Sequence, residues 1–179
     1  MSVVEDPPEE AYGRVTNPER FAPLVPAAEE LIADLQRRFD VTVTLGPGAT
    51  DRELRTMKVT PTQPDQAPLT ITVTSFPGVY VAAGAWQQIA LPACGCDACD
   101  EDADDAVQVL HEYCTAVVEG QLFERITGRR ILEHTWKGAD WSRSGKRPLS
   151  RQRAAALRSK AVQPPSGGHW RPWSVKTSS

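Results

Sequence analysis

The chain has 179 residues, of which 40% are hydrophobic and 24% are charged, the composition of a soluble protein with one domain plus appendages. No stretch approaches twenty consecutive apolar residues, which excludes a transmembrane helix, and the acidic, proline-rich start lacks the pattern of a signal peptide. We therefore expect a cytoplasmic protein with no membrane association, in which cysteine thiols stay reduced.

The net charge of -3 hides a strong asymmetry along the chain. Residues 1–126 carry 8 basic and 21 acidic side chains, whereas residues 127–179 carry 12 basic and 2 acidic ones. A basic segment of this kind either meets a polyanion or folds onto the acidic body of its own chain, and both alternatives stay open.

The first predicted element is a helix that follows a disordered lead-in, residues 1–16, rich in proline and glutamate. Asn17-Pro18-Glu19 is a helix-start signal, and apolar residues recur at helical spacing from there to Phe39. Because a proline in a helix interior removes a hydrogen bond, the regular helix begins as late as Pro26 in this interpretation.

Five short segments with alternating apolar residues follow this helix, and many of them are β-branched. Such alternation predicts strands that are covered on one face only. The connections are too short for parallel crossovers, so we expect an antiparallel sheet of three to five strands. The predicted strands lie at 41–45, 54–61, 69–74, 79–82 and 86–91.

A long helix is predicted at 103–127, with an apolar stripe that includes Cys114 and an end marked by Gly128-Arg129-Arg130. The fold class is therefore α+β: one domain at 17–130, in which an N-terminal helix and the long helix flank the sheet.

Residues 131–179 are predicted to be a basic tail rich in Trp, Pro and Ser, mostly disordered apart from a short helix at 150–161. Its aromatic residues either stack on nucleic-acid bases or clamp the tail onto the body, and we favour the clamp. The tryptophans concerned are Trp136, Trp141, Trp170 and Trp173.

Three cysteines within six residues, Cys94, Cys96 and Cys99, are the most informative feature of the chain. Their thiolates can provide three ligands to a zinc ion from one tight loop, and Gly95 permits the backbone angles that such a loop needs. The fourth ligand is unknown. The candidates are His111, Cys114 and Asp97, although the place of Cys114 on the apolar stripe favours a buried core thiol.

Other interpretations of the cysteine loop are weaker. Cys96 and Cys99 have the spacing of a redox pair, but the surrounding carboxylates oppose thiolate formation. A deaminase zinc site is excluded because no H-x-E precedes the cysteines. The remaining alternative is a loop with three spare thiols.

Three segments, Tyr12–Phe21, Phe76–Gly78 and Cys94–Glu101, resemble an uncharacterised family of actinobacterial proteins, a domain of unknown function. The last segment, CGCDACDE, is the most specific, and the resemblance covers residues 12–130. It implies a bacterial, cytoplasmic setting and transfers no functional residues.

We expect a small binding or adaptor module with a zinc-holding cysteine loop and an unidentified protein partner, rather than an enzyme. No Walker loop, dinucleotide fingerprint or nucleophile elbow is present in the sequence. One alternative is a metal- or thiol-dependent enzyme that uses the same loop. Another is nucleic-acid binding through the tail at 137–179.

Overall fold

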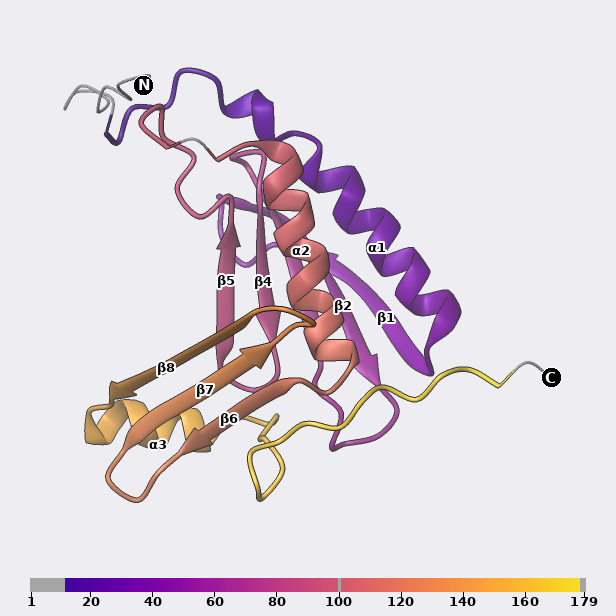
Figure 1. Cartoon of the computed structure of the whole chain (residues 1–179), viewed down its shortest axis with the longest axis vertical. Helices are drawn as coiled ribbons and strands as arrows, with labels where there is room; N and C mark the ends of the chain where they lie inside the picture. The colour runs from indigo at the N-terminus through magenta and orange to yellow at the C-terminus, as the bar shows by residue number, and fades with distance from the viewer. Residues whose placement is uncertain (1–11, 100, 178–179) are drawn as a thin grey trace.

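The computed structural model describes residues 12–99 and 101–177, which form two antiparallel sheets and three α-helices (Figure 1). No helix in these two stretches is long and apolar enough to cross a membrane. In chain order the elements are η2 (Pro18–Phe21), α1 (Leu24–Arg38), β1 (Val41–Pro47), β2 (Glu53–Pro61), β3 (Leu69–Thr74), β4 (Val79–Ala83), β5 (Gln87–Leu91), α2 (Ala103–Val118), β6 (Leu122–Ile126), β7 (Ile131–Lys137), β8 (Ser142–Pro148) and α3 (Arg151–Arg158).

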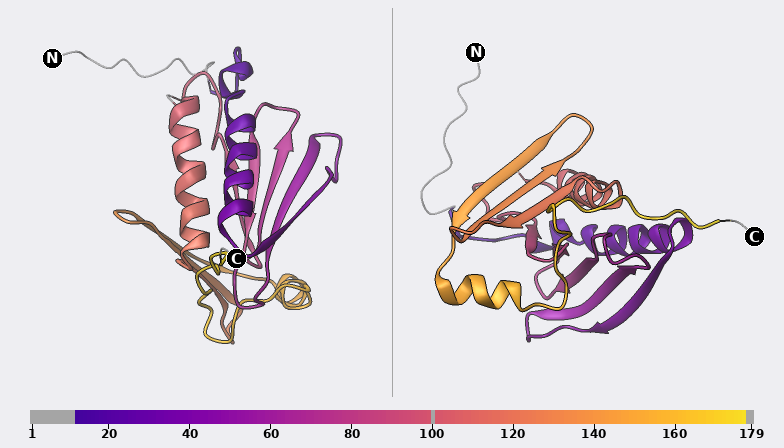
Figure 2. Two further views of the ribbon diagram at one scale, coloured as in Figure 1. Left: turned by 90° about the vertical axis from the view of Figure 1, so that its right-hand side faces the viewer. Right: turned by 90° about the horizontal axis from the view of Figure 1, so that it is seen from below.

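The larger sheet is a five-stranded meander, β1-β2-β3-β4-β5, and it confirms the antiparallel sheet and its five predicted strands. Alternate residues such as Ile71 and Val81, which pair across β3 and β4, are buried. Figure 2 shows α1 and α2 on one face of this sheet, and no described helix covers the other face. Threonines such as Thr70 and Thr72 lie on that uncovered face, which explains the period-two pattern.

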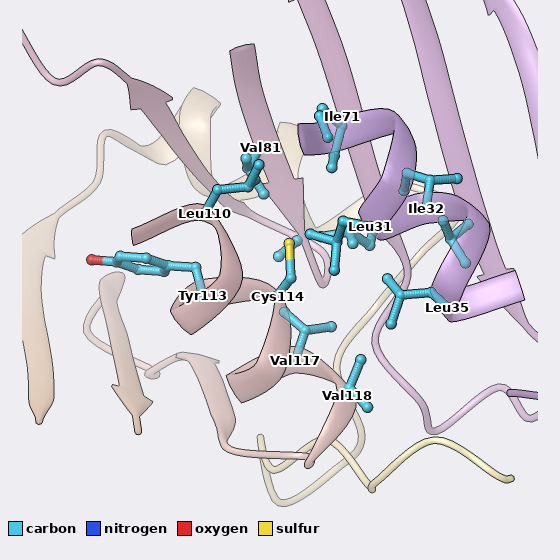
Figure 3. Close-up of a cluster of buried hydrophobic side chains, with 14 of the residues drawn as sticks. Leu31, Ile32, Leu35, Ile71, Val81, Leu110, Tyr113, Cys114, Val117 and Val118 are labelled. Carbon is cyan, nitrogen blue, oxygen red and sulfur yellow. The ribbon is translucent and has the colours of Figure 1, made fainter. Parts of the chain in front are cut away.

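The main core lies between the two helices and the larger sheet (Figure 3). Leu31 from α1 and Leu110 and Val117 from α2 meet there, and Cys114 lies among them with no exposed surface. The prediction that Cys114 is a core thiol is confirmed. Burial raises the pKa of Cys114 to about 12, so this thiol stays protonated.

The long helix is shorter than predicted: α2 ends at Val118, and the expected helical turns up to residue 127 are wrong. Gly120 adopts a left-handed φ of +69°, and its N–H donates to the carbonyl of Val117 (3.1 Å). The N–H of Gln121 donates to the carbonyl of Ala116 (2.7 Å), which completes a glycine-based helix end. Leu122 then begins β6 instead of a further helical turn.

The prediction of a mostly disordered tail after residue 130 is also wrong, because β6, β7 and β8 form a second sheet that was not predicted. The β6–β7 hairpin crosses the predicted boundary between residues 130 and 131. The helix expected at 150–161 is present as α3. Its buried Ala154 and Leu157 pack against Leu132 and Leu149 in a second, smaller core.

The last described residues, 161–177, run back along the body and end near α1 (Figure 1). Trp170 and Trp173 are 2% and 4% exposed. The indole N–H of Trp173 donates to the carbonyl of Ala67 (2.9 Å), and its ring packs edge-on against Phe39. These tryptophans therefore clamp the tail onto the body, as the favoured interpretation predicted.

Glu124 on β6 ties three parts of the chain together and has no exposed surface. Its carboxylate accepts hydrogen bonds from the backbone N–H groups of Ala85 and Trp86 (both 2.8 Å) and from the indole N–H of Trp170 (2.9 Å). Burial raises the pKa of Glu124 above its usual range, and the three donors partly offset that effect. The sequence offered no sign of this buried carboxylate.

Candidate metal centre

The cysteine loop connects β5 to α2 and lies at the end of the molecule opposite α3 (Figure 1). The Sγ atoms of Cys94 and Cys96 are 3.1 Å apart, and those of Cys96 and Cys99 are 3.4 Å apart. All three sulfurs lie within 4.8 Å of one another, so the predicted convergence is found. Cys94 is exposed, Cys96 is buried and Cys99 is half-buried.

Gly95 shapes the loop between the first two cysteines. Its φ is +77°, a left-handed value that glycine adopts without strain. A Cβ atom at this position would lie 3.0 Å from the ring of Phe76 and 3.2 Å from Pro92. The loop therefore sits directly on the aromatic cluster of Phe76 and Phe21, whose ring centroids are 6.1 Å apart.

The acidic residues around the cysteines brace the loop. Glu101 accepts hydrogen bonds from the backbone N–H groups of Ala93 (2.7 Å) and Cys94 (3.2 Å). Asp102 is the N-cap of α2 and accepts from the backbone N–H of Asp105 (2.8 Å). Through these hydrogen bonds Glu101 fixes the start of the loop, and Asp102 fixes the first turn of the helix that follows it.

Residues 12–20 lie against the same loop. Asp97 accepts hydrogen bonds from the Arg14 guanidinium (3.0 Å) and from the Thr16 backbone N–H (2.9 Å). The guanidinium of Arg20 donates to the carbonyl of Cys96 (3.1 Å). The disordered lead-in predicted at 1–16 is thus wrong for residues 12–16, and residues 1–11 lie outside the described part of the chain.

The pKa values of the clustered thiols move in opposite directions. Hydrogen bonds from the Cys94 thiol and the Gly13 backbone lower the pKa of Cys96 to about 6. The hydrogen bond to Cys96, followed by that to Cys94, raises the pKa of Cys99 to about 12. Hydrogen bonds therefore lower the pKa of Cys96, although the nearby carboxylates were expected to oppose thiolate formation.

None of the candidate fourth ligands joins the three sulfurs in the described residues. Asp97 lies in the loop, but its carboxylate is held by Arg14 and Thr16, and these contacts lower its pKa. His111 is exposed on α2 beside the groove between α1 and α2, and Cys114 is in the core. Asp100, the carboxylate next to Cys99 in the sequence, is not among the described residues.

Residues 2–177 match the sequence model of a family described as a family of unknown function, DUF6226. The chain belongs to this family. The resemblance expected from the sequence is confirmed, and the match extends beyond residues 12–130 through the small sheet and the C-terminal segment. No curated protein and no solved structure matches the chain. Family membership therefore assigns no activity, so a function can be inferred only from the side chains of the site and their geometry.

Sequence reasoning missed the residues that support the site, Arg14, Thr16, Arg20 and Glu101. Arg14 and Asp97 are separated by 83 positions, and neither stands in a pattern that predicts their pairing. The one available signal was the concentration of carboxylates after Cys99, which predicted opposition to thiolate formation but not hydrogen bonds to the backbone of the loop. These contacts became visible only in the folded chain.

Proposed function

We propose that Cys94, Cys96 and Cys99 bind a single zinc ion and that the chain is a small binding or adaptor module stabilised at this loop. The observation that carries the proposal is the convergence of three sulfurs within 4.8 Å. Cysteine thiolates are soft ligands that favour zinc over magnesium or calcium, and reduced thiols are the normal state in a cytoplasm.

The sulfur separations favour one ion rather than a cluster. Zinc–sulfur bonds of about 2.3 Å in a tetrahedron put ligand sulfurs about 3.8 Å apart. The observed separations of 3.1 and 3.4 Å need to open by less than one ångström to match. In a [4Fe–4S] cluster each cysteine binds a different iron atom, which requires a wider arrangement than this one.

The fourth coordination position is open to an outside ligand in this proposal. In the described residues no other histidine, cysteine or carboxylate reaches the sulfurs, and Cys94 is exposed. A water molecule or a donor atom from a bound partner can complete the tetrahedron. An adaptor role uses this position to recognise a partner that carries a free histidine, cysteine or carboxylate.

The alternative function is a metal-dependent enzyme that uses the same loop, and the open position favours it. Catalytic zinc sites have three protein ligands and an exchangeable water, whereas structural sites have four protein ligands. Against this alternative, all three nearby carboxylates accept hydrogen bonds: Asp97 from Arg14, Glu101 from the backbone of the loop, and Asp102 from the first turn of α2. None of them is free to act as a general base toward a metal-bound water.

Cobalt substitution tests the proposal. We expect Co²⁺ to give intense thiolate-to-metal charge-transfer absorption and the ligand-field bands of a tetrahedral site. Cys99→Ser should weaken both, and Cys114→Ala, the matched control in the core, should leave them unchanged. Exogenous imidazole should shift the ligand-field bands because it enters the open position. A weak octahedral spectrum, or one that the Cys99→Ser change leaves intact, would contradict the site.

A further inference from the structure

Five arginines gather at the end of the molecule opposite the cysteine loop, and we call this set the arginine end: Arg129, Arg130, Arg147, Arg151 and Arg158. Figure 1 shows the β6–β7 turn, the end of β8 and α3 together at the lower left. The N–H of Leu149 donates to the carbonyl of Arg130 (2.8 Å), and the Arg158 guanidinium donates to the carbonyl of Thr127 (3.1 Å). The three elements are therefore in direct contact.

Among the described residues, no acidic side chain is paired with the arginine end. All five side chains are exposed, and none of them forms an ion pair within residues 12–99 and 101–177. Residues 141–179 contain 9 basic and no acidic side chains. The neighbouring Glu133 is already paired with Arg125 and Lys146 on the outer face of the small sheet. The result is a concentrated positive field on one end of a chain whose net charge is negative.

The backbone of Arg130 is strained, which is a second and independent observation at the arginine end. Its φ is +61°, and it is the only residue other than glycine in the left-handed region within the described stretches. Glycine or asparagine normally occupies this position of a hairpin turn. The chain places Gly128 two residues earlier and keeps an arginine at the strained position, which presents its side chain at the tip.

We propose that the arginine end binds the phosphate backbone of a nucleic acid. Guanidinium groups match phosphate oxygens in pairs, and an array spread over three elements fits the repeated phosphates of a nucleic-acid strand. This inference is independent of the metal site, because it rests on residues at the other end of the molecule.

No large apolar side chain of the described residues is exposed at this end, which favours a nucleic acid over a membrane or a protein partner. Membrane-surface helices bury an apolar face, and protein interfaces centre on large apolar or aromatic anchors. None of the large exposed hydrophobic residues in the described chain lies on β6, β7, β8 or α3. They are Tyr12, Val15, Leu45, Leu54, Tyr80 and Val175.

Fluorescence anisotropy with labelled oligonucleotides tests the proposal on the full-length protein. Duplex DNA, duplex RNA and the single strands are compared, and tight binding of one class identifies which backbone geometry fits. We expect dissociation constants of about 10⁻⁶–10⁻⁴ M near physiological salt. With five phosphate contacts, the slope of log K against log salt should be about −4.5. No binding of any oligonucleotide at low salt overturns the proposal.

A pair of double variants locates the surface. Arg129→Glu with Arg130→Glu should reduce the salt slope by about 2 and weaken binding at least tenfold at low salt. The control, Arg52→Glu with Lys58→Glu, makes the same change in net charge at exposed positions in the β1–β2 turn and on β2, and it should leave binding within about twofold. Equal weakening by the two pairs would mean that binding follows the net charge, which overturns the arginine end as the site.

Arg130→Gly separates folding from binding. Glycine relieves the left-handed backbone, so the melting temperature should stay the same or rise while the affinity for the oligonucleotide falls. A variant with unchanged affinity contradicts a role for Arg130 at the tip.

Binding of polyglutamate, or of vesicles that contain phosphatidylserine, with the affinity found for oligonucleotides also overturns the proposal. So does salt-sensitive self-association in place of oligonucleotide binding, seen by analytical ultracentrifugation.

Discussion

Replacing Glu124 by glutamine should destabilise the fold strongly, although the side chain keeps its size. The carboxylate offers acceptors to three donors, the N–H groups of Ala85 and Trp86 and the indole N–H of Trp170. A glutamine keeps one oxygen, so its NH₂ group must face at least one of these donors. Each buried donor that loses its acceptor costs about 1–3 kcal/mol. We therefore expect a loss of about 2–3 kcal/mol in the free energy of unfolding.

Urea unfolding followed by tryptophan fluorescence and by far-UV circular dichroism measures this loss. In a thermal scan, the same change lowers the melting temperature by roughly 4–12 °C for a chain of this size. Glu133→Gln is the matched control, because Glu133 lies on the paired strand β7 and bonds to the exposed Arg125 and Lys146. It should cost less than about 1 kcal/mol.

The reasoning fails if Glu124→Gln and Glu133→Gln change the free energy of unfolding by equal amounts, or if Glu124→Gln stabilises the protein. Either result would mean that the fold does not need an acceptor-only group at this position. The contact between the C-terminal segment and the turn before β5 would then not depend on the carboxylate.

Three further predictions concern pH, the end of α2 and thiol access. Because burial raises the pKa of Glu124, the folded state binds its proton more tightly than the unfolded chain does. The stability lost in Glu124→Gln should therefore grow from neutral to mildly acidic pH in urea titrations, and a constant difference would contradict the raised pKa. Gly120→Ala should cost about 1–3 kcal/mol in urea unfolding, because φ is +69° and a Cβ would lie 2.5 Å from the Pro172 nitrogen. Gly128→Ala, with nothing within 4 Å, should cost much less, and equal costs would refute the argument. In metal-free protein, iodoacetamide should label the exposed Cys94 while Cys114 stays unmodified, as read by mass spectrometry. Comparable labelling of Cys114 would place it outside the core.

The larger sheet was predictable because the polarity of each side chain matches its burial in the sheet. Apolar residues of β3 such as Leu69 and Ile71 face the helices, and threonines such as Thr70 face away. Apolar and polar residues therefore alternate along the strand with a period of two. The N-terminal helix was predictable for the same reason with a period of 3.6. In both elements one face alone meets the core.

The small sheet was not predictable, because its strands are held by few buried side chains. The strand β8 reads Ser-Arg-Ser-Gly-Lys-Arg-Pro and is exposed along most of its length. Its order comes from pairing with β7 and from the buried Leu149 and Leu157 beside it. A segment rich in arginine and serine has the composition of a disordered tail, so tertiary contacts decide its structure here.

The candidate metal site was predictable only in part. The spacing of Cys94, Cys96 and Cys99 indicated that the sulfurs meet, because chain closure over so few residues is cheap in entropy. No fourth ligand joins the sulfurs among the described residues. For Cys114 this was predictable from its place on the apolar stripe, whereas for Asp97 it was not, because the residues that hold Asp97 are far away in the sequence.

Native mass spectrometry of protein purified under reducing conditions, without added metal, tests the central claim most directly. The account predicts one zinc ion per folded chain. The ion should be retained in Cys114→Ala and lost in Cys94→Ser, Cys96→Ser and Cys99→Ser. A wild-type protein that stays metal-free with all thiols reduced, even after incubation with excess zinc, would contradict the account and leave three unused thiols in a loop that carboxylates hold.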